Sequence, residues 1–279
     1  MARERSIRAL DPYETRSALS QYLTFHFGRP EDLLPYPDGP SSGLHYPARY
    51  VRECVDHERL PSGARALDLG CGVGGLTFEL ARYCGEVVGI DLSRRFVAAG
   101  RELQRRGRIR YDRIEEGALT ASAVAIVPAG IDRSRVRFER GDATALRADL
   151  GVFDLVVMAN LLDRVGDPLR CLSQLPSLVA PGGQVVISSP YTWLPEYTPR
   201  AKWLGGVVRR GRATHTHDTL RRAMGPAFRL IRRLDVPFTI RDHARKFQWA
   251  VADATVWLRT EARPSGAGRA RRADHRRRS

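Results

Sequence analysis

The chain has 279 residues, 43% of them hydrophobic, which is enough for one substantial core and ordinary for a globular protein. No apolar run approaches the roughly 18 residues that a membrane-spanning helix needs. The first residues also lack the apolar segment of a secretory signal. We therefore expect a cytoplasmic protein without a membrane partner.

The formal net charge of +15 is unevenly distributed along the chain. Residues 263–279 hold seven Arg and one Asp, so +6 of that charge falls in one short stretch. Because this stretch also contains Pro and Gly and almost no apolar residues, we predict a disordered Arg-rich tail over residues 261–279. An arm that binds polyanions is the alternative, which leaves an RNA-binding or RNA-modifying protein open.

The N-terminal 60 residues are rich in aromatic side chains and precede the first strong strand. The pattern predicts a helix over residues 17–27, an irregular path through the prolines at 30–47, and a second helix over residues 48–59. We interpret residues 1–60 as an N-terminal helical and aromatic extension that folds over a cleft as a lid.

Strands and helices then alternate over residues 61–260. Strands are predicted at 64–69, 86–92, 135–139, 153–159 and 184–189, and helices at 75–84, 94–106 (with Ser93 as N-cap), 167–179 and 219–228. Two late strands, 230–240 and 248–259, have no helix between them, which indicates one antiparallel strand. Residues 108–111 and 122–127 predict a β-hairpin insertion. The fold class is α/β: a Rossmann-like, doubly wound, mostly parallel seven-stranded sheet.

A glycine-rich loop follows the first strand of this domain, in the string Asp68-Leu69-Gly70-Cys71-Gly72-Val73-Gly74-Gly75. Ligands of doubly wound sheets bind beyond the carboxyl ends of the strands. Gly70, Gly72 and Gly75 also satisfy the dinucleotide fingerprint, so a nicotinamide enzyme must be considered. A carboxylate at Asp68 would repel a pyrophosphate and favour the positively charged end of S-adenosylmethionine.

Two further acidic residues end the next strands. Asp91 closes the second strand, where it can accept hydrogen bonds from ribose hydroxyls, and Asp142 follows the third, where it can accept from an adenine amino group. This set predicts an S-adenosylmethionine-dependent methyltransferase with S-adenosylhomocysteine as product; a non-catalytic relic is the remaining alternative. The candidate cofactor-binding residues are Asp68, Gly70, Cys71, Gly72, Asp91, Leu92, Asp142, Ala143 and Asn160.

The acceptor side is predicted at the ends of the fourth and fifth strands. The fourth opens at Asn160 without the Asn-Pro-Pro-Tyr-like turn of enzymes that methylate base amines, so a nucleic-acid partner is not expected. The fifth leads to Tyr191 and Trp193, which favours substrate contact over the alternative of a packed loop. His26 lies between Phe25 and Phe27 and is either a packed residue or part of the lid site.

Charged residues gather between the two late strands, in Asp242-His243-Ala244-Arg245-Lys246-Phe247. A solvated turn is one interpretation; the other is that Arg245, with Lys246 second, pairs with a substrate carboxylate. The four cysteines lack the spacing of a zinc site, and we predict that they are reduced and that the enzyme needs no metal.

From about Tyr13 to Leu258 the chain resembles the C-terminal methyltransferase domain of ovothiol synthase, a 4-mercaptohistidine N1-methyltransferase family. The most restrictive shared strings are Ser189-Pro190-Tyr191-Thr192-Trp193-Leu194 and Ala244-Arg245-Lys246-Phe247-Gln248. Tyr22-Leu23-Thr24-Phe25-His26-Phe27-Gly28 also matches, whereas the glycine loop is common to the whole superfamily. Ovothiol synthase couples this domain to a non-haem iron sulfoxide synthase, for which this chain shows no counterpart.

The resemblance implies the methylation step alone: transfer to the π ring nitrogen of 5-thiohistidine or of its selenium analogue 5-selenohistidine, as in ovothiol or ovoselenol biosynthesis. A separate sulfur- or selenium-installing enzyme would act upstream. The sequence leaves sulfur and selenium open, and another small heteroaromatic or amino-acid acceptor is the alternative within enzymes.

The expected mechanism is in-line displacement by a ring nitrogen. A neutral imidazole already has a nucleophilic lone pair, so the protein's tasks are alignment and selection of the tautomer. Asn160, Tyr191 and His26 are the candidate catalytic residues. The candidate substrate-binding residues are Tyr13, Phe25, His26, Tyr191, Trp193, Arg245 and Lys246.

Overall fold

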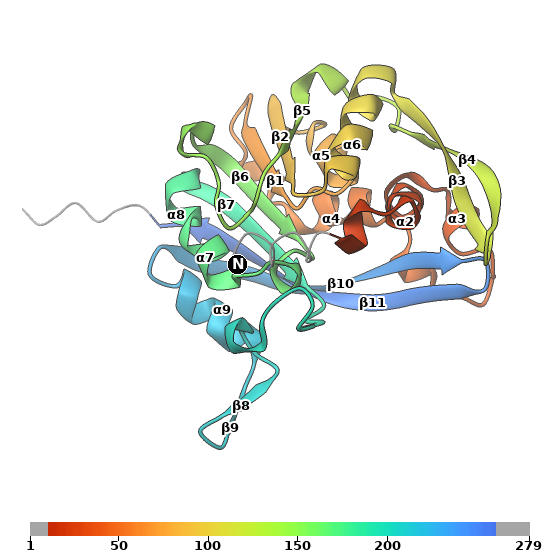
Figure 1. The fold of residues 1–279 in the computed structure, drawn as a ribbon. Helices are drawn as coiled ribbons and strands as arrows, with labels where there is room; N and C mark the ends of the chain where they lie inside the picture. The colour runs from red at the N-terminus through yellow and green to blue at the C-terminus, as the bar shows by residue number, and fades with distance from the viewer. Residues whose placement is uncertain (1–10, 261–279) are drawn as a thin grey trace, which may run out of the picture.

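A seven-stranded sheet forms the centre of the computed structural model, which describes residues 11–260 (Figure 1). The strand order is β10-β11-β7-β6-β1-β2-β5. Only β11 runs antiparallel to its neighbours, which confirms the predicted α/β class and its single antiparallel strand. The strands are β1 (Arg65–Leu69), β2 (Glu86–Asp91), β5 (Val136–Arg140), β6 (Phe153–Ala159), β7 (Val179–Ser189), β10 (Phe228–His243) and β11 (Lys246–Arg259).

The central strands are continuous apolar runs because helices cover both faces of the sheet. Val156 and Val157 of β6 are both fully buried, and they belong to two different hydrophobic clusters, one on each face. One face carries α2 (Arg16–Phe27), α4 (Tyr46–Cys54), α5 (Gly75–Leu80) and α6 (Arg94–Arg106). The other carries α7 (Pro168–Ser173), α8 (Leu175–Leu178) and α9 (Thr216–Met224).

Several predicted helices keep their place but change their bounds. Ser93 caps α6 as predicted, since its Oγ accepts a hydrogen bond from the Phe96 amide at 3.2 Å. The helix predicted over residues 167–179 is split at Gln174 into α7 and α8, and Pro176 in the first turn of α8 lacks the N–H that would bond back into α7. The chain after α8 joins β7 directly, so β7 begins earlier than predicted.

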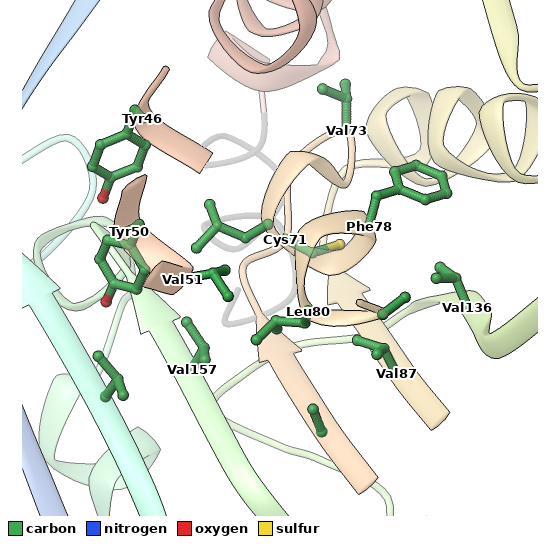
Figure 2. Close-up of a cluster of buried hydrophobic side chains, with 14 of the residues drawn as sticks. Tyr46, Tyr50, Val51, Cys71, Val73, Phe78, Leu80, Val87, Val136 and Val157 are labelled. Atoms are coloured by element: carbon green, nitrogen blue, oxygen red, sulfur yellow. The ribbon is translucent and has the colours of Figure 1, made fainter. Parts of the chain in front are cut away.

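The N-terminal segment packs into the same core as the rest of the chain. Helix α2 matches the predicted helix closely, a short α3 (Pro30–Leu33) follows, and α4 begins earlier and ends sooner than expected. Figure 2 shows Tyr50 and Val51 of α4 beside Val157 of β6 and Leu80 of α5. The core therefore crosses the predicted boundary at residue 60 without interruption, and that boundary stays a prediction.

Two hairpins leave the central sheet. The predicted insertion is present as β3 (Arg108–Glu116) and β4 (Leu119–Ile126), whose tip reaches the turn between β10 and β11 (Figure 1). A second hairpin, β8 (Val207–Arg209) and β9 (Arg212–Thr214), was not predicted because its strands are only three residues long. Within residues 11–260, no helix is both long and apolar enough to cross a membrane. The predicted Arg-rich tail lies outside the described residues.

A pair of glycine variants tests how tightly the loop after β1 is packed. Gly74 has φ +95°, and a Cβ there would lie 2.4 Å from the ring of Phe138, whereas Gly63 has φ +73° with nothing within 4 Å. We expect Gly74→Ala to lower the free energy of unfolding by about 2–4 kcal/mol, through backbone strain and overpacking together. Gly63→Ala should lower it by only about 1 kcal/mol, from strain alone. Equal losses in urea unfolding would contradict this packing.

Candidate active site

The loop between β1 and α5 is shaped by left-handed glycines and by the end of the neighbouring strand. Gly70, Gly72 and Gly74 all have positive φ, between 56° and 95°. The amides of Gly70 and Cys71 donate to the carbonyl of Ile90 in β2, at 2.8 and 3.1 Å. These bonds turn the chain sharply and fix the loop at the carboxyl edge of the sheet, where L side chains would strain the backbone.

Asp91 and Asp142 lie at the ends of the next two strands, as predicted. The Asp91 carboxylate accepts hydrogen bonds from the amides of Gly72 and Ser93, both at 2.9 Å, and its burial raises its pKa. Asp142 accepts from the amide and the hydroxyl of Thr144. The Gly141 amide donates to the Asp91 carbonyl, which ties the two strand ends together. Leu92 and Ala143 are the residues that follow these two aspartates.

Asp68 differs from the expectation that its charge faces the ligand. It is 1% exposed, and its carboxylate accepts a 2.7 Å hydrogen bond from the hydroxyl of Thr77 on α5. Burial raises the pKa of Asp68 to about 7, so the group is partly protonated near neutrality. Cys71 is buried as well and directs its thiol to the Gly72 carbonyl. Asp68 therefore joins β1 to α5 beneath the loop.

Tyr13 and helix α2, here called the roof, lie against the glycine loop. The ring nitrogen Nδ1 of His26 accepts a hydrogen bond from the Gly75 amide at 2.9 Å. A Cβ at Gly75 would lie 2.8 Å from His26, and one at Gly72 would lie 3.3 Å from both His26 and Tyr22. Burial lowers the pKa of His26 to about 3, so its imidazole is neutral.

An aromatic cluster closes the roof on the side of β2. Tyr13 contacts the rings of Tyr22, Phe96 and Tyr197, with centroids 5.8–5.9 Å apart. The Ser93 hydroxyl donates to the carbonyl of Tyr13 at 3.1 Å. Burial raises the pKa of Tyr22 to about 12, so its hydroxyl stays neutral. Tyr13 is thus held beside Ser93, two residues after the Asp91 strand end.

Four charged residues, here called the clasp, join the tip of the β3–β4 hairpin and the end of β10 to α3. Figure 1 shows these segments close together. The four residues are Asp32, Arg113, Glu115 and Arg241. Arg113 pairs with both Asp32 and Glu115. Arg241, 4% exposed, donates to the Glu115 carboxylate and to the carbonyl of Asp32, both at 2.6 Å. The hairpin insertion and the β10–β11 turn therefore enclose α2 and α3.

Asn160 is held in a left-handed conformation, with φ 52°, at the end of β6. Its amide nitrogen donates to the hydroxyl of Tyr46 at 3.1 Å, and its amide oxygen accepts from the hydroxyl of Ser188 at 3.1 Å. The ring of Phe25 from the roof stacks on Tyr46 at 5.3 Å. Tyr46, which was not predicted as a site residue, thus connects two that were, Asn160 and Phe25.

Tyr191 and Trp193 have different surroundings, on the face that carries α9. Tyr191 has φ 56°, and its hydroxyl donates to the Asp253 carboxylate at 2.6 Å. Trp193 is buried, donates to the Thr216 hydroxyl and stacks on Trp203. That environment matches the packed-loop alternative for Trp193.

Arg245 and Lys246 lie at the β10–β11 turn, apart from the strand ends. The Arg245 guanidinium lies over the Tyr36 ring at 5.9 Å from its centroid, and Lys246 pairs with Asp242 at 3.1 Å. The structure does not bring either residue to the loop or to Asn160, so their contact with a substrate carboxylate stays a prediction.

Sequence reasoning missed Tyr46 and Ser188, the partners of Asn160. Tyr46 follows His45, a second residue with positive φ (54°), and lies 114 positions from Asn160 in the chain. No local pattern marks such a pair, and the helix predicted from the sequence began at residue 48, after Tyr46. Within the described chain, no group of three or more His, Cys, Asp or Glu is placed to hold a metal ion.

Comparison with known families gives a match over residues 44–227 to a methyltransferase domain. The chain is 31% identical over 152 residues to the ubiquinone biosynthesis O-methyltransferase of Xanthomonas axonopodis pv. citri (strain 306), covering 54% of each chain. It is 28% identical over 186 residues to the Methylococcus capsulatus protein of that description, covering 65% of this chain and 66% of the other. The chain thus spans about half the length of the curated relatives it matches.

Solved structures of methyltransferases share the fold. Magnesium protoporphyrin IX methyltransferase from Synechocystis, determined with bound S-adenosylhomocysteine, superposes with a TM-score of 0.52 at 16% identity, over 90% of this chain and 98% of the other. A Methanosarcina mazei S-adenosylmethionine-dependent methyltransferase gives a TM-score of 0.50 at 19% identity, over 73% and 96%. At these identities the likeness concerns the fold alone.

The neutral His26 makes a pH-dependent contribution to stability. The unfolded histidine takes up a proton near its ordinary pKa of 6.5, whereas the folded one does so only near pH 3. The contribution is therefore complete above pH 6.5 and is lost as the pH falls toward 3, by up to about 1.4 kcal/mol per pH unit.

The matched variant is His26→Asn, whose Oδ1 can accept from the Gly75 amide without titrating. We expect the wild-type protein to lose stability relative to this variant as the pH is lowered from 6.5 to 4.5, measured by urea unfolding at each pH. Parallel pH profiles for the two proteins would show that His26 is not held neutral by burial.

Proposed function

The chain belongs to the S-adenosylmethionine-dependent methyltransferases, and we propose that it methylates the π ring nitrogen of 5-thiohistidine or of 5-selenohistidine. The observation that carries the proposal is the hydrogen-bonded Asn160–Tyr46–Ser188 group, next to a roof whose histidine is neutral. The resemblance of the strings around Tyr191 and Arg245 to the ovothiol family supports the choice of acceptor.

The chemistry of the strand ends fits the cofactor. Carboxylates at Asp91 and Asp142 are acceptors for ribose hydroxyls and for an adenine amino group, and the glycines of the loop permit close approach of a ligand to the backbone. S-adenosylmethionine supplies the methyl group when it is bound. Asp91 also stabilises the loop between β1 and α5, because its carboxylate accepts a hydrogen bond from the Gly72 amide.

The acceptor ring requires orientation more than it requires a base. A neutral imidazole nitrogen attacks with its own lone pair, and the enzyme must expose the correct nitrogen by bonding the other one. The Asn160 side chain carries both a donor and an acceptor, and Tyr46 and Ser188 fix which atom points where. We assign the selection of the ring tautomer to this residue.

Methylation of an oxygen acceptor, as the names of the curated relatives describe for them, suits the site less well. A phenol must lose its proton as it attacks, which calls for a general base with a pKa near the working pH. His26 cannot take that part, because its Nδ1 lone pair already accepts from Gly75 and its pKa is about 3. A nitrogen acceptor needs no such base.

The roof also excludes water from the reacting atoms. Tyr13, Tyr22 and Phe25 cover the strand ends with apolar ring surface. The helix that carries two of them is held by Ser20, which donates to the Asp112 carbonyl, and by Gln21, which donates to the Asp242 carboxylate. A dry site strengthens the hydrogen bonds that orient the acceptor. A separate enzyme would install the sulfur or selenium before this step.

Incubation with labelled S-adenosylmethionine tests the acceptor directly. We expect methyl transfer to 5-thiohistidine, to 5-selenohistidine or to both, with product identified by mass spectrometry and the methylated nitrogen by NMR. L-Histidine and a catechol serve as controls for the chalcogen and for an oxygen acceptor. Failure to methylate both chalcogen-bearing histidines, or transfer to the catechol instead, would refute the proposed acceptor.

A carboxylate variant tests the cofactor assignment. Replacing Asp91 with Ala removes hydrogen bonds to a charged acceptor, worth about 1.5–3 kcal/mol, so the affinity for S-adenosylhomocysteine should fall about 10- to 100-fold in calorimetry. Asp149→Ala is the control, because Asp149 is exposed and pairs only with the exposed Arg147 among the residues described. Unchanged affinity in Asp91→Ala would remove Asp91 from the cofactor site.

A further inference from the structure

A cavity of about 430 Å³ opens beside the end of β7, on the face of the sheet that carries α9. Its walls come from three parts of the chain that are distant in sequence. Tyr191 and Trp193 belong to the segment after β7, Thr216, His217 and Asp218 form the first turn of α9, and Arg233 lies on β10. In Figure 1, α9 lies next to β10, and the β8–β9 hairpin projects from the same region. The volume suits a small molecule.

One buried carboxylate fixes several of the lining side chains. Asp253 of β11 is 9% exposed and lies opposite Ser189 in the sheet register. It accepts a 2.6 Å bond from the Tyr191 hydroxyl and a two-pronged pair from the Nε and Nη2 of Arg233, at 2.8 and 3.0 Å. These two bonds fix the orientation of the guanidinium. Its Nη1 takes no part in the pair with Asp253, and about half of the Arg233 side chain is exposed.

Polar groups around the cavity have spare hydrogen-bonding capacity. The Nδ1 atom of His217 is buried, lies 3.8 Å from the Asp253 carboxylate and has no hydrogen-bond partner among the described residues. Burial lowers the pKa of His217, so its ring is neutral. The N-cap residue of α9, His215, makes no side-chain bond to the first-turn amides. Buried polar atoms are normally paired, so this nitrogen is available for a hydrogen bond to a molecule in the cavity.

Backbone strain gives an independent indication. Tyr191 is one of four non-glycine residues with positive φ in the described chain, and it lies at the mouth of the cavity. A tyrosine in this conformation costs about 1–3 kcal/mol, and such strain is concentrated at ligand-binding positions. The bond to Asp253 holds the ring in place against that cost.

The lining offers opposite charges to one small ligand. Arg233 is a rigid donor for a carboxylate, and the N-terminal turn of α9, to which the N-cap side chain makes no hydrogen bond, favours the same group. Asp218, exposed in that first turn, is an acceptor for an ammonium group. Tyr191 and Trp193 add an aromatic wall. A zwitterion can pair with both Arg233 and Asp218, whereas a simple anion would be repelled by the Asp218 carboxylate.

We propose that this cavity binds the ammonium and carboxylate groups of an α-amino acid, the carboxylate on Arg233 and the first turn of α9, the ammonium group on Asp218. The bound group is the amino-acid end of the methyl acceptor, a step that rests on the proposed function. Arg233 then takes the role that sequence analysis gave to Arg245, which lies over Tyr36 at the β10–β11 turn.

Calorimetry on the full chain, with S-adenosylhomocysteine present, tests the proposal with three probes: L-histidine, histamine, which lacks the carboxylate, and imidazolepropionate, which lacks the ammonium group. We expect L-histidine to bind at least 10-fold more tightly than either analogue.

Two variants test the individual contacts. Asp218→Asn should lower the affinity for L-histidine about 10-fold and leave the affinity for imidazolepropionate unchanged. Because Asp218 is exposed, this substitution should not disturb the fold. Arg233→Gln should weaken L-histidine and imidazolepropionate but not histamine.

Arg229→Gln is the matched control, since Arg229 is exposed on the same strand and outside the cavity lining. Equal binding of the three probes, unchanged L-histidine binding in both cavity variants, or no binding of either L-histidine or 5-thiohistidine would overturn the proposal. The two proposals fail separately. Selective L-histidine binding without methylation of a chalcogen-bearing histidine keeps the cavity and refutes that acceptor; methylation with an unchanged KM in both variants keeps the acceptor and refutes the cavity.

Discussion

The hydrogen bond from the Gly75 amide to Nδ1 of His26 is the contact on which the candidate site depends. The first amides of a helix have no partner within it, and α5 begins at Gly75. His26 satisfies one of them, and it can do so only as a neutral imidazole. The absence of a Cβ at Gly75 lets the roof approach this closely. The glycines that shape the loop after β1 therefore also seat the helix that covers it.

That contact would not hold the roof alone, and the two long hairpins complete the support. The clasp joins Glu115 at the tip of one hairpin to Arg241 near the tip of the other, with Asp32 between them. Arg241 is almost fully buried, so removing Glu115 would leave part of a buried guanidinium without a hydrogen-bond acceptor. The same two segments bond to α2 directly, through Ser20 to the Asp112 carbonyl and through Gln21 to the Asp242 carboxylate, and so position α2 over the strand ends.

Two strained residues lie where the methyl acceptor is proposed to bind. Asn160 and Tyr191 follow neighbouring strands, and both have φ near +55°. Each is held by a residue from a distant part of the chain, Asn160 by Tyr46 and Tyr191 by Asp253. Asn160 belongs with the roof on one face of the sheet, and Tyr191 with α9 on the other. The ends of β6 and β7 therefore each carry one strained residue, held on opposite faces of the sheet by a partner that is distant in the chain.

The sequence by itself determined the architecture, because apolar periodicity, helix caps and turn residues are local signals and the alternation of strands and helices restricts the topology. The glycine loop, the acidic residues that end β2 and β5, and the β3–β4 insertion were predicted for this reason. Only the tertiary structure decided which side chains meet. Asp68 turns inward to Thr77, Trp193 packs on Trp203, Arg245 lies at a distant turn, and Tyr46 joins Asn160. Such pairings depend on the relative placement of elements that lie far apart in the chain, and no short stretch of sequence records that placement.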